Sequence, residues 1–325
     1  MKNVVVLDFG SNSVRLSINQ MHERNGKTFF KEIKRLKDTT RLAEGMGESR
    51  KKQLSAAAIE RTLAAVRHFK DIYQSYPEYQ VYAIATAAVR EAQNSQIFLE
   101  QIKQLTGCAI KVLSGETEAY YDYLGAANSL ALKDFLITDM GGGSCELILV
   151  KAGAMQERVS LPYGAVSLTE RFCHAGQLSA ARLFEFQNFI SDKLGPLSWL
   201  QEANTLPLVL MGGCNRTVAR IQRVREGYTQ IDNIHGYTVS TGHFFQIYKT
   251  FLKKNVVQRE HIAGMEPARA DIILGGMTPP VVYLLQQLHS AGVVFSESGA
   301  REGFLYELLQ KQEQAKKHIQ FENEK

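Results

Sequence analysis

The 325-residue sequence has few of the features that mark secreted, membrane-spanning or disordered proteins. Its 4 cysteines fall singly, with neither a CxxC pair nor a regular spacing, so neither a zinc site nor a disulfide framework is predicted. No apolar run approaches the roughly 20 residues that cross a bilayer, and the apolar run after Asn3 is too short for a signal peptide. Only 7 prolines and a 45% share of hydrophobic residues set the chain apart from disordered and collagen-like sequences. We therefore expect a folded, cytoplasmic protein that has no membrane partner.

The charge of the chain is nearly balanced and gives no indication of a nucleic-acid partner. Lysine and arginine number 38 against 33 aspartates and glutamates, which leaves a net charge of +5. An excess of this size weakly favours an anionic ligand. The length exceeds the roughly 100 to 200 residues of a single domain, so we expect two domains.

The hydrophobic pattern indicates an internal duplication. An unbroken apolar run at 4–7 predicts a buried strand, which ends in a turn at Asp8-Phe9-Gly10 and is followed by a second strand. The run at 135–138 ends in the same way at Asp139-Met140-Gly141, 131 residues later (139 − 8), and a strand follows again. So long an offset means two copies of a domain rather than a solenoid, whose repeats are roughly 20 to 50 residues long. We therefore expect a cleft between two related halves.

The rest of the chain predicts alternating helices and strands. Apolar residues at helical spacing between 54 and 73 predict a long amphipathic helix, and the charged residues from Gln310 onward predict a fraying helix or a solvated tail. The predicted domains are residues 1–125 and 126–308, followed by a polar tail at 309–325. This division leaves open whether the last helix packs back on the N-terminal domain.

Two turns rich in glycine and serine follow the two strand ends. They read Gly10-Ser11-Asn12-Ser13 and Gly141-Gly142-Gly143-Ser144. Such turns can point several backbone N–H groups into one concavity, and their small side chains let a phosphate approach the backbone. One such turn alone would more often be an ordinary tight hairpin, but two at matching positions favour a pair of phosphate-binding loops. Met211-Gly212-Gly213, after another apolar strand, is a third and weaker candidate.

An aspartate stands at the end of each strand, where it would repel a phosphate unless a cation lay between them. Mg²⁺ is held by one or two carboxylates together with phosphate oxygens and water. Asp8, Asp139 and Glu146 could supply such carboxylates, and Glu146 shares the face of its strand with Ser144. The alternative for Glu146 is a solvated strand residue. The sequence has neither a GxxxxGK[ST] motif nor a GxGxxG motif that opens a helix, which excludes two other kinds of nucleotide site.

Several motifs resemble those of one protein family, in that family's order. The two glycine-rich turns with their aspartates look like the phosphate loops of the superfold that actin, sugar kinases and heat-shock chaperones share. Segments similar to signatures of the exopolyphosphatase and guanosine pentaphosphate phosphatase family are Ala85-Thr86-Ala87-Ala88-Val89-Arg90-Glu91-Ala92, Ser114-Gly115-Glu116-Thr117-Glu118-Ala119, Arg269-Ala270-Asp271-Ile272-Ile273 and Arg301-Glu302-Gly303. The resemblance extends from residue 3 to about residue 308. It implies an α/β fold of two actin-like, or ribonuclease-H-like, domains with a cleft between them.

The resemblance also implies roles for individual residues. Glu118 matches the family's general base for the attacking water, and Arg90 matches an arginine of the phosphate cleft. Asp139 and Glu146 match carboxylates linked to magnesium, and Arg269 is expected to face the same cleft. Without the resemblance, Glu118 is a helix acid that the helix dipole favours, and both arginines are solvated.

These roles predict a phosphatase that releases terminal orthophosphate from inorganic polyphosphate, guanosine pentaphosphate or both, with Mg²⁺ or another divalent cation. One alternative is an ATP-dependent small-molecule kinase of the same superfold, which Glu118 and Arg301-Glu302-Gly303 disfavour. A second alternative is a sensor that binds a nucleotide or alarmone without turnover. A homodimer is left open.

Two departures from the family pattern bear on the prediction. Cys214 stands where the family usually has threonine, which removes a hydroxyl group next to Gly213, the third predicted phosphate contact. Longer relatives also carry a C-terminal domain with paired His-Asp residues, and this sequence ends at Lys325 without one. Because a shorter anionic track makes fewer phosphate contacts, the sequence predicts a preference for short polyphosphates.

Overall fold

The computed structural model describes residues 2–24, 27–46, 52–277 and 279–323. The elements of the first half are β1 (Asn3–Phe9), β2 (Val14–Arg24), β3 (Lys27–Asp38), α1 (Ala56–Tyr73), β4 (Tyr79–Ala85), α2 (Ala87–Glu91), α3 (Ser95–Thr106), β5 (Ile110–Val112) and α4 (Gly115–Ala127). Those of the second half are β6 (Phe135–Met140), β7 (Cys145–Lys151), β8 (Ala154–Leu161), α5 (Ala165–Phe172), α6 (Ala180–Leu194), the 3-10 helix η1 (Ser198–Ala203), β9 (Leu208–Met211), α7 (Gly213–Arg225), β10 (Thr238–Ser240), α8 (Thr241–Lys253), α9 (Val256–Glu260), the 3-10 helix η2 (Pro267–Arg269), α10 (Ile273–Met277), α11 (Pro279–Gln287), β11 (Gly292–Phe295) and α12 (Ala300–Asn323).

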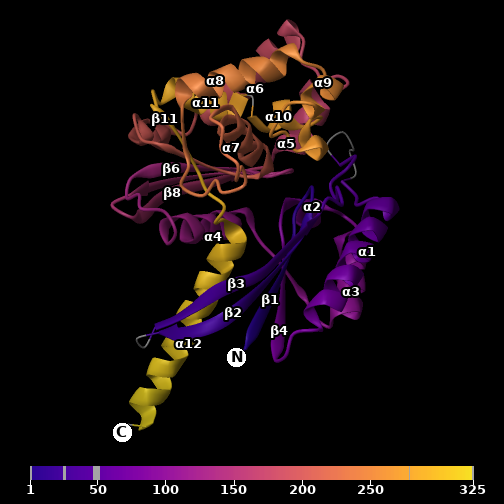
Figure 1. The fold of residues 1–325 in the computed structure, drawn as a ribbon, viewed down its shortest axis with the longest axis vertical. Coiled ribbons are helices and arrows are strands. Elements are labelled where there is room, and N and C mark those ends of the chain that lie inside the picture. Colours follow the sequence, from indigo (N-terminus) through magenta and orange to yellow (C-terminus); the bar gives the residue numbers. More distant parts are fainter. Residues whose placement is uncertain (1, 25–26, 47–51, 278, 324–325) are drawn as a thin grey trace.

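The described strands form two sheets (Figure 1) that share the order and direction of five strands, and the second sheet has β10 as an additional edge strand. The first sheet has the order β3-β2-β1-β4-β5, and the second has the order β10-β11-β9-β6-β7-β8. Each contains an antiparallel hairpin, β1–β2 or β6–β7, whose first strand pairs in parallel with a later strand, β4 or β9. The outer strand of each hairpin pairs with a third antiparallel strand, β3 or β8. The predicted α/β class and the duplication are thus confirmed by the order and direction of the strands.

The first strand of each hairpin is buried along nearly its whole length. In β1 only Asp8 is partly exposed, and in β6 only Asp139 is. Strands of this kind are covered on both faces, which explains their unbroken apolar runs. The two aspartates mark the point at which each strand opens toward the space between the halves.

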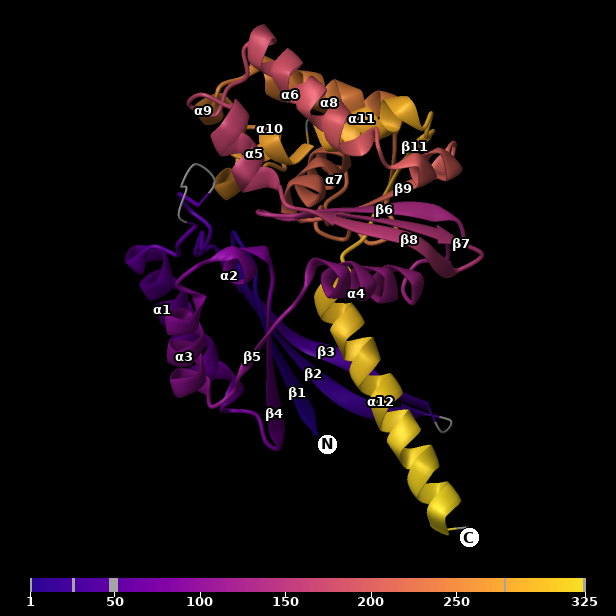
Figure 2. The same cartoon turned by 180° about the vertical axis from the view of Figure 1, so that it is seen from behind.

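Two helices cross from one half of the chain to the other. α4 follows the first sheet, but Ala119 and Ala126 pack into the core of the second sheet. α12 follows the second sheet but runs alongside the first sheet (Figure 2). Its Phe304 and Leu305 pack into a core cluster with residues of β1 and β4. The two helices touch at Gly303, where a Cβ atom would lie 1.9 Å from a backbone oxygen of α4. The crossing helices therefore connect the two cores.

The helices differ in length from the predictions, and none of those described is a membrane span. The predicted boundary at 308/309 falls inside α12, which continues to Asn323, and the boundary at 125/126 falls in the last turn of α4. Lys311 donates a hydrogen bond to Glu307 at 2.9 Å, one turn away, and such pairs support a helix that has few apolar residues. Among the described residues, no helix combines the length and the apolar character that a bilayer requires.

Candidate active site

The turns of the two hairpins lie on a cleft between the sheets, in a cavity of about 110 Å³. Each turn is closed by the same backbone hydrogen bond, from Gly10 N to Ser13 O at 3.1 Å and from Gly141 N to Ser144 O at 3.0 Å. The predicted loop residues that line this cleft are Gly10, Ser11, Asn12, Ser13, Gly141, Gly142 and Ser144. The structure therefore brings together turns that are far apart in the sequence.

Glycine is required where the two turns meet. A Cβ atom at Gly142 would lie 2.6 Å from the Cβ of Ser11, closer than such atoms approach in proteins. A Cβ atom at Gly143 would lie 3.2 Å from both the Cβ of Ala87 and the Oγ of Ser11. Gly143 does not line the cleft but borders a larger neighbouring cavity, so it brings the turns together rather than facing the cleft.

The two aspartates face different partners across their hairpins. In the first hairpin Asp8 is opposite Arg15, and the Arg15 Nη1 atom lies 3.9 Å from Asp8 Oδ2. In the second, Asp139 is opposite Glu146. Burial raises the pKa of Asp8, and Arg15 opposes this shift. Burial also raises the pKa of Asp139, with Arg216 and Arg15 acting in the opposite direction.

Glu146 is fully buried and does not itself line the cleft. Its Oε1 atom accepts a hydrogen bond from Ser160 Oγ at 2.7 Å. Burial raises the pKa of Glu146 well above its usual range, and the nearby charges of Glu118 and Asp139 add to the shift. The alternative of a solvated strand residue is therefore wrong for Glu146.

The second hairpin suits a divalent cation better than the first does. Among the residues that the structure describes, Asp139 Oδ1 and Glu146 Oε2 are buried and have no hydrogen-bond partner. Two carboxylates with free oxygens are what Mg²⁺ takes from a protein when phosphates and water complete its shell. Within the same described ranges, however, no three acidic, histidine or cysteine side chains form a group that could hold one ion. The predicted set of Asp8, Asp139 and Glu146 is thus not a preformed three-carboxylate site, because Arg15 occupies the position opposite Asp8.

Glu118 lies in the first turn of α4 and lines the cleft. Ser114 caps this helix by accepting a hydrogen bond from Thr117 N at 3.1 Å. Arg90 Nη1 donates to Glu118 Oε2 at 2.9 Å and to the carbonyl of Leu113 at 2.9 Å. Only 7% of Glu118 is exposed, and burial raises its pKa to about 7 although Arg90 lowers it. Glu118 is therefore a carboxyl group that changes its protonation near neutral pH.

Arg90 itself borders a neighbouring cavity rather than the cleft. Its guanidinium is joined to the cleft through the 2.9 Å contact with Glu118. The structure thus gives Arg90 a direct role in holding the carboxyl group of Glu118.

Among the residues that the structure describes, four arginines line the cleft, and of these only Arg269 is a predicted site residue. Arg15, Arg216 and Arg301 are the others. Burial lowers the pKa of Arg216 to about 9, with Arg15 and Arg269 adding to the shift. So many cations around one cavity favour an anion with several charges. A signal for Arg15 exists in the sequence, because it stands 131 residues before Glu146 (146 − 15) and is its counterpart in the duplication.

The third glycine turn, at Met211-Gly212-Gly213, leaves room for the side chain of Arg269 in the cleft. Gly213 lines the cleft, and a Cβ atom there would lie 2.0 Å from the guanidinium carbon of Arg269. Cys214 is fully buried in the core of the second half and does not itself line the cleft. It lies beside Gly276 and close to Arg269. Burial raises the pKa of the Cys214 thiol, and the charge of Arg269 lowers it.

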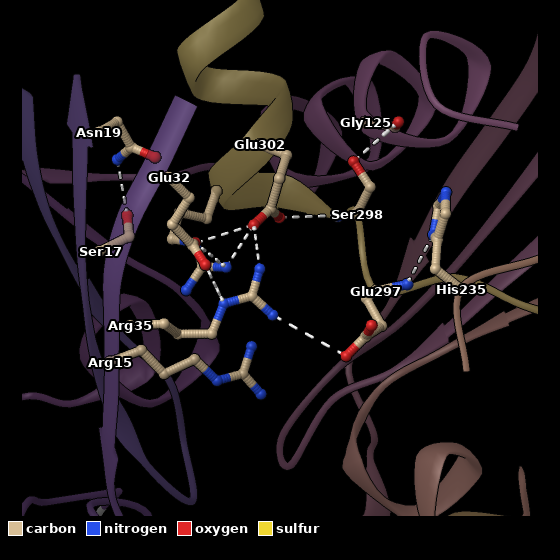
Figure 3. Close-up of polar contacts among 12 residues, drawn as sticks. Arg15, Ser17, Asn19, Glu32, Arg35, Gly125, His235, Glu297, Ser298 and Glu302 are labelled. Atoms are coloured by element: carbon tan, nitrogen blue, oxygen red, sulfur yellow. Dashed lines mark hydrogen bonds and ion pairs between the residues drawn. The ribbon is translucent and has the colours of Figure 1, made fainter. Parts of the chain in front are cut away.

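Ion pairs hold one rim of the cleft (Figure 3). Arg35 of β3 donates to Glu32 at 2.8 Å and lies 3.9 Å from Glu297 and 3.6 Å from Glu302. Arg301, whose side chain is 5% exposed, lies 3.5 Å from Glu32. Alternating charges of this kind fix the arginines in position and connect the first sheet to the segment before α12.

The sequence matches one family over most of its length. A model of the Ppx/GppA phosphatase family matches residues 20–312. A curated relative, the bifunctional 3-dehydroquinate synthase/phosphatase of Fusobacterium nucleatum, is 29% identical over 280 residues, which are 83% of this chain and 41% of that protein. The chain therefore spans less than half of that relative.

Solved structures resemble this one over nearly their whole length. The crystal structure of the Aquifex aeolicus member of the Ppx/GppA family has a TM-score of 0.75 and 28% sequence identity, and the likeness covers 95% of this chain and 98% of that one. An exopolyphosphatase from Cytophaga hutchinsonii has a TM-score of 0.85 and 24% identity, with the same coverage. These likenesses confirm the predicted fold of two actin-like domains.

Proposed function

Because the chain belongs to the Ppx/GppA phosphatase family, we propose that it hydrolyses the terminal phosphoanhydride bond of inorganic polyphosphate or of guanosine pentaphosphate. The observation that carries this proposal is Glu118, a buried carboxyl group in the cleft with a pKa of about 7. It stands beside two glycine turns that can bind phosphate, and Arg90 holds its orientation at 2.9 Å. Hydrolysis needs a base next to the bound phosphate, because a proton must be removed from the attacking water. Binding of phosphate alone does not need a base.

In the proposed reaction a water molecule attacks the terminal phosphorus while Glu118 takes one of its protons. The bond between that phosphorus and the bridging oxygen breaks, the shortened chain keeps the bridging oxygen with its negative charge, and orthophosphate is released. A base with a pKa near the working pH combines a useful ionised fraction with sufficient basicity. Glu118 fits this requirement because burial raises its pKa while Arg90 keeps the charged form accessible.

The cleft supports the charge that spreads over the phosphate oxygens. The backbone N–H groups of the two turns and the guanidinium groups of Arg15, Arg216 and Arg269 are the proposed donors. Arginine suits this task because its planar fork pairs with two phosphate oxygens at once. The pairing of Asp8 with Arg15 orients that arginine within the proposed site.

Asp139 and Glu146 are the proposed ligands of Mg²⁺ or another divalent cation. Their unpartnered buried oxygens, noted above for the described residues, support this assignment. The bound ion would neutralise charge on the phosphate oxygens during the displacement. We assign Asp8 to Arg15 and not to the ion, since the two lie opposite each other in the hairpin.

Phosphate release from three substrates tests the proposal. Short polyphosphate, long polyphosphate and guanosine pentaphosphate are incubated side by side with the purified protein and Mg²⁺, with and without a sugar or acetate acceptor. The expected result is acceptor-independent release of orthophosphate from at least one substrate. Transfer of phosphate to the added acceptor in place of orthophosphate release would indicate a kinase, and binding with neither release nor transfer would indicate a sensor.

A further inference from the structure

A second buried acid lies one turn after Glu118 on α4. Asp122 is 0% exposed, and within the part of the chain that the structure describes no side chain donates a hydrogen bond to its carboxylate oxygens, which the backbone amide of Ala300 approaches. The reaction proposed above makes no use of it. A buried acid with so little compensation costs stability, so its presence beside a cleft needs a physical reason.

Asp122 lies behind the lining of the cleft. Gly299 lines the cleft, and a Cβ atom there would lie 3.2 Å from Asp122 Oδ1 and 3.6 Å from Met211 Sδ. Met211 is the neighbour of Asp139 across the paired strands β6 and β9. Ser298, next to Gly299, donates a hydrogen bond to a backbone carbonyl of α4 at 2.9 Å, which fastens this segment to the helix (Figure 3). Asp122 on α4 and Asp139 on β6 are thus both near the contact between Gly299 and Met211.

Three further carboxyl groups act on Asp122. Burial raises the pKa of Asp122 well above its usual range, and the charges of Asp139, Glu146 and Glu118 raise it further, in this order. The backbone amide of Ala300 acts in the opposite direction. The pKa values of all four carboxyl groups are raised, chiefly by burial, so without a cation their neutral forms are favoured, and a divalent cation is the group that would stabilise their charged forms together.

We propose that Asp122 is part of the cation site, as a charge behind the ligands that strengthens the binding of a divalent cation by Asp139 and Glu146. This inference rests on the metal site of the proposed function. A charge acts on an ion through the protein interior without contact, because the local dielectric constant is low. Groups outside the direct ligands of a metal commonly change its affinity by roughly 10- to 100-fold. Asp122 would therefore act on the ion without contacting either the ion or the substrate.

Binding of Mn²⁺ alone, measured by titration calorimetry without substrate, tests this inference. Asp122→Asn preserves the shape of the side chain and removes its charge, so it is expected to weaken Mn²⁺ binding by about 10- to 100-fold. Asp139→Asn removes a proposed ligand and is expected to weaken it at least as much. Glu116→Gln removes a charge from the first turn of the same helix, where the side chain is 81% exposed, and is expected to leave the affinity unchanged.

Thermal unfolding in the presence of a chelator distinguishes this role from a structural one. Asp122→Leu replaces a buried acid, which has no side-chain hydrogen-bond partner among the described residues, with an apolar group, so the melting temperature of the metal-free protein is expected to stay the same or rise. The stabilisation that Mn²⁺ adds is expected to shrink in both Asp122 variants. A fall of the metal-free melting temperature in both variants, with unchanged Mn²⁺ affinity, would overturn the inference.

The result for Asp139→Asn separates this inference from the proposed function. If that variant weakens Mn²⁺ binding and Asp122→Asn does not, Asp122 has no part in the cation site while the proposed function stands. If neither variant weakens it, the proposed metal site is wrong and the inference fails with it.

Discussion

The two hairpins that meet in the cleft have the same backbone arrangement but differ in the charge of one cross-strand residue. Asp8 and Asp139 end the first strand of their hairpins, and the same hydrogen bond closes both turns. Across the hairpin, however, Asp8 faces Arg15 while Asp139 faces Glu146. Residues directly opposite each other in an antiparallel pair place their side chains close together on one face of the sheet. The first hairpin therefore neutralises its own carboxylate, and the second leaves two carboxylates side by side.

This difference divides the work of the proposed site. The hairpin with the Asp8–Arg15 pair can offer N–H donors and a guanidinium to a phosphate without a cation. The hairpin with Asp139 and Glu146 would repel the same phosphate unless a cation lay between them. In the proposed site, a difference of charge at one matching position of the duplicated structure would thus give the two hairpins different roles.

The largest expected effect is on kcat and concerns Glu118. Glu118→Gln is expected to lower kcat by about 10² to 10⁴-fold, because an amide keeps the shape of the side chain but cannot take a proton from water. Substrate affinity is expected to change little. Glu116→Gln, in the same helical turn but with an 81% exposed side chain, is the matched control and should retain wild-type kcat. If Glu118→Gln retained more than about half of wild-type kcat, the base would lie elsewhere.

The comparison of the hairpins is tested directly by a pair of matched substitutions. Asp139→Asn is expected to raise the Mg²⁺ concentration for half-maximal activity by about 10-fold or more, since the site loses a charged oxygen ligand. Asp8→Asn is expected to leave that concentration unchanged and to raise KM, because Arg15 loses its partner. Mg²⁺ titrations of both variants give the answer. Equal shifts in the two variants would mean that both hairpins hold the ion.

The contact between the hairpins predicts a smaller effect. Gly142→Ala is expected to destabilise the protein by about 1 to 3 kcal/mol, the usual cost of overpacking, because its Cβ atom would overlap Ser11. Gly242→Ala, where an added Cβ would contact nothing within 4 Å, serves as the control and should be no less stable than wild type. Urea denaturation measures both. Wild-type stability and activity in Gly142→Ala would show that the two turns can separate freely.

The smallest expected effect is on the pH profile. Glu118 must be ionised to act as a base, so kcat/KM is expected to fall as the pH decreases through about 7. The positive charge of Arg90 lowers the pKa of Glu118. Removing it in Arg90→Gln is therefore expected to move the acidic limb of the profile to higher pH. A shift to lower pH would contradict the pairing of these two residues.

Most of the elements and half of the site could be predicted from local patterns. The apolar runs before Asp8 and Asp139, and the glycine turns after them, are contiguous in the sequence, and their order matches the order of the strands. The four arginines are different, because a single arginine has no pattern that distinguishes a buried one from a solvated one. Arg216 and Arg301 come from the starts of two helices far apart in the sequence. Their convergence depends on how the two halves pack.

The sequence by itself determined the duplication, the strand–turn–strand chemistry and the positions of the loop glycines, because short-range sterics and alternating or continuous apolar residues decide backbone geometry locally. The tertiary structure alone decided the electrostatics. It placed Glu118 beside Arg90, buried Glu146 and left Asp122 without a side-chain hydrogen-bond partner in the described part of the chain. These properties depend on desolvation and on distances between residues that only packing brings together. A pKa of about 7 for Glu118 is accordingly a property of the cleft and not of the helix that carries it.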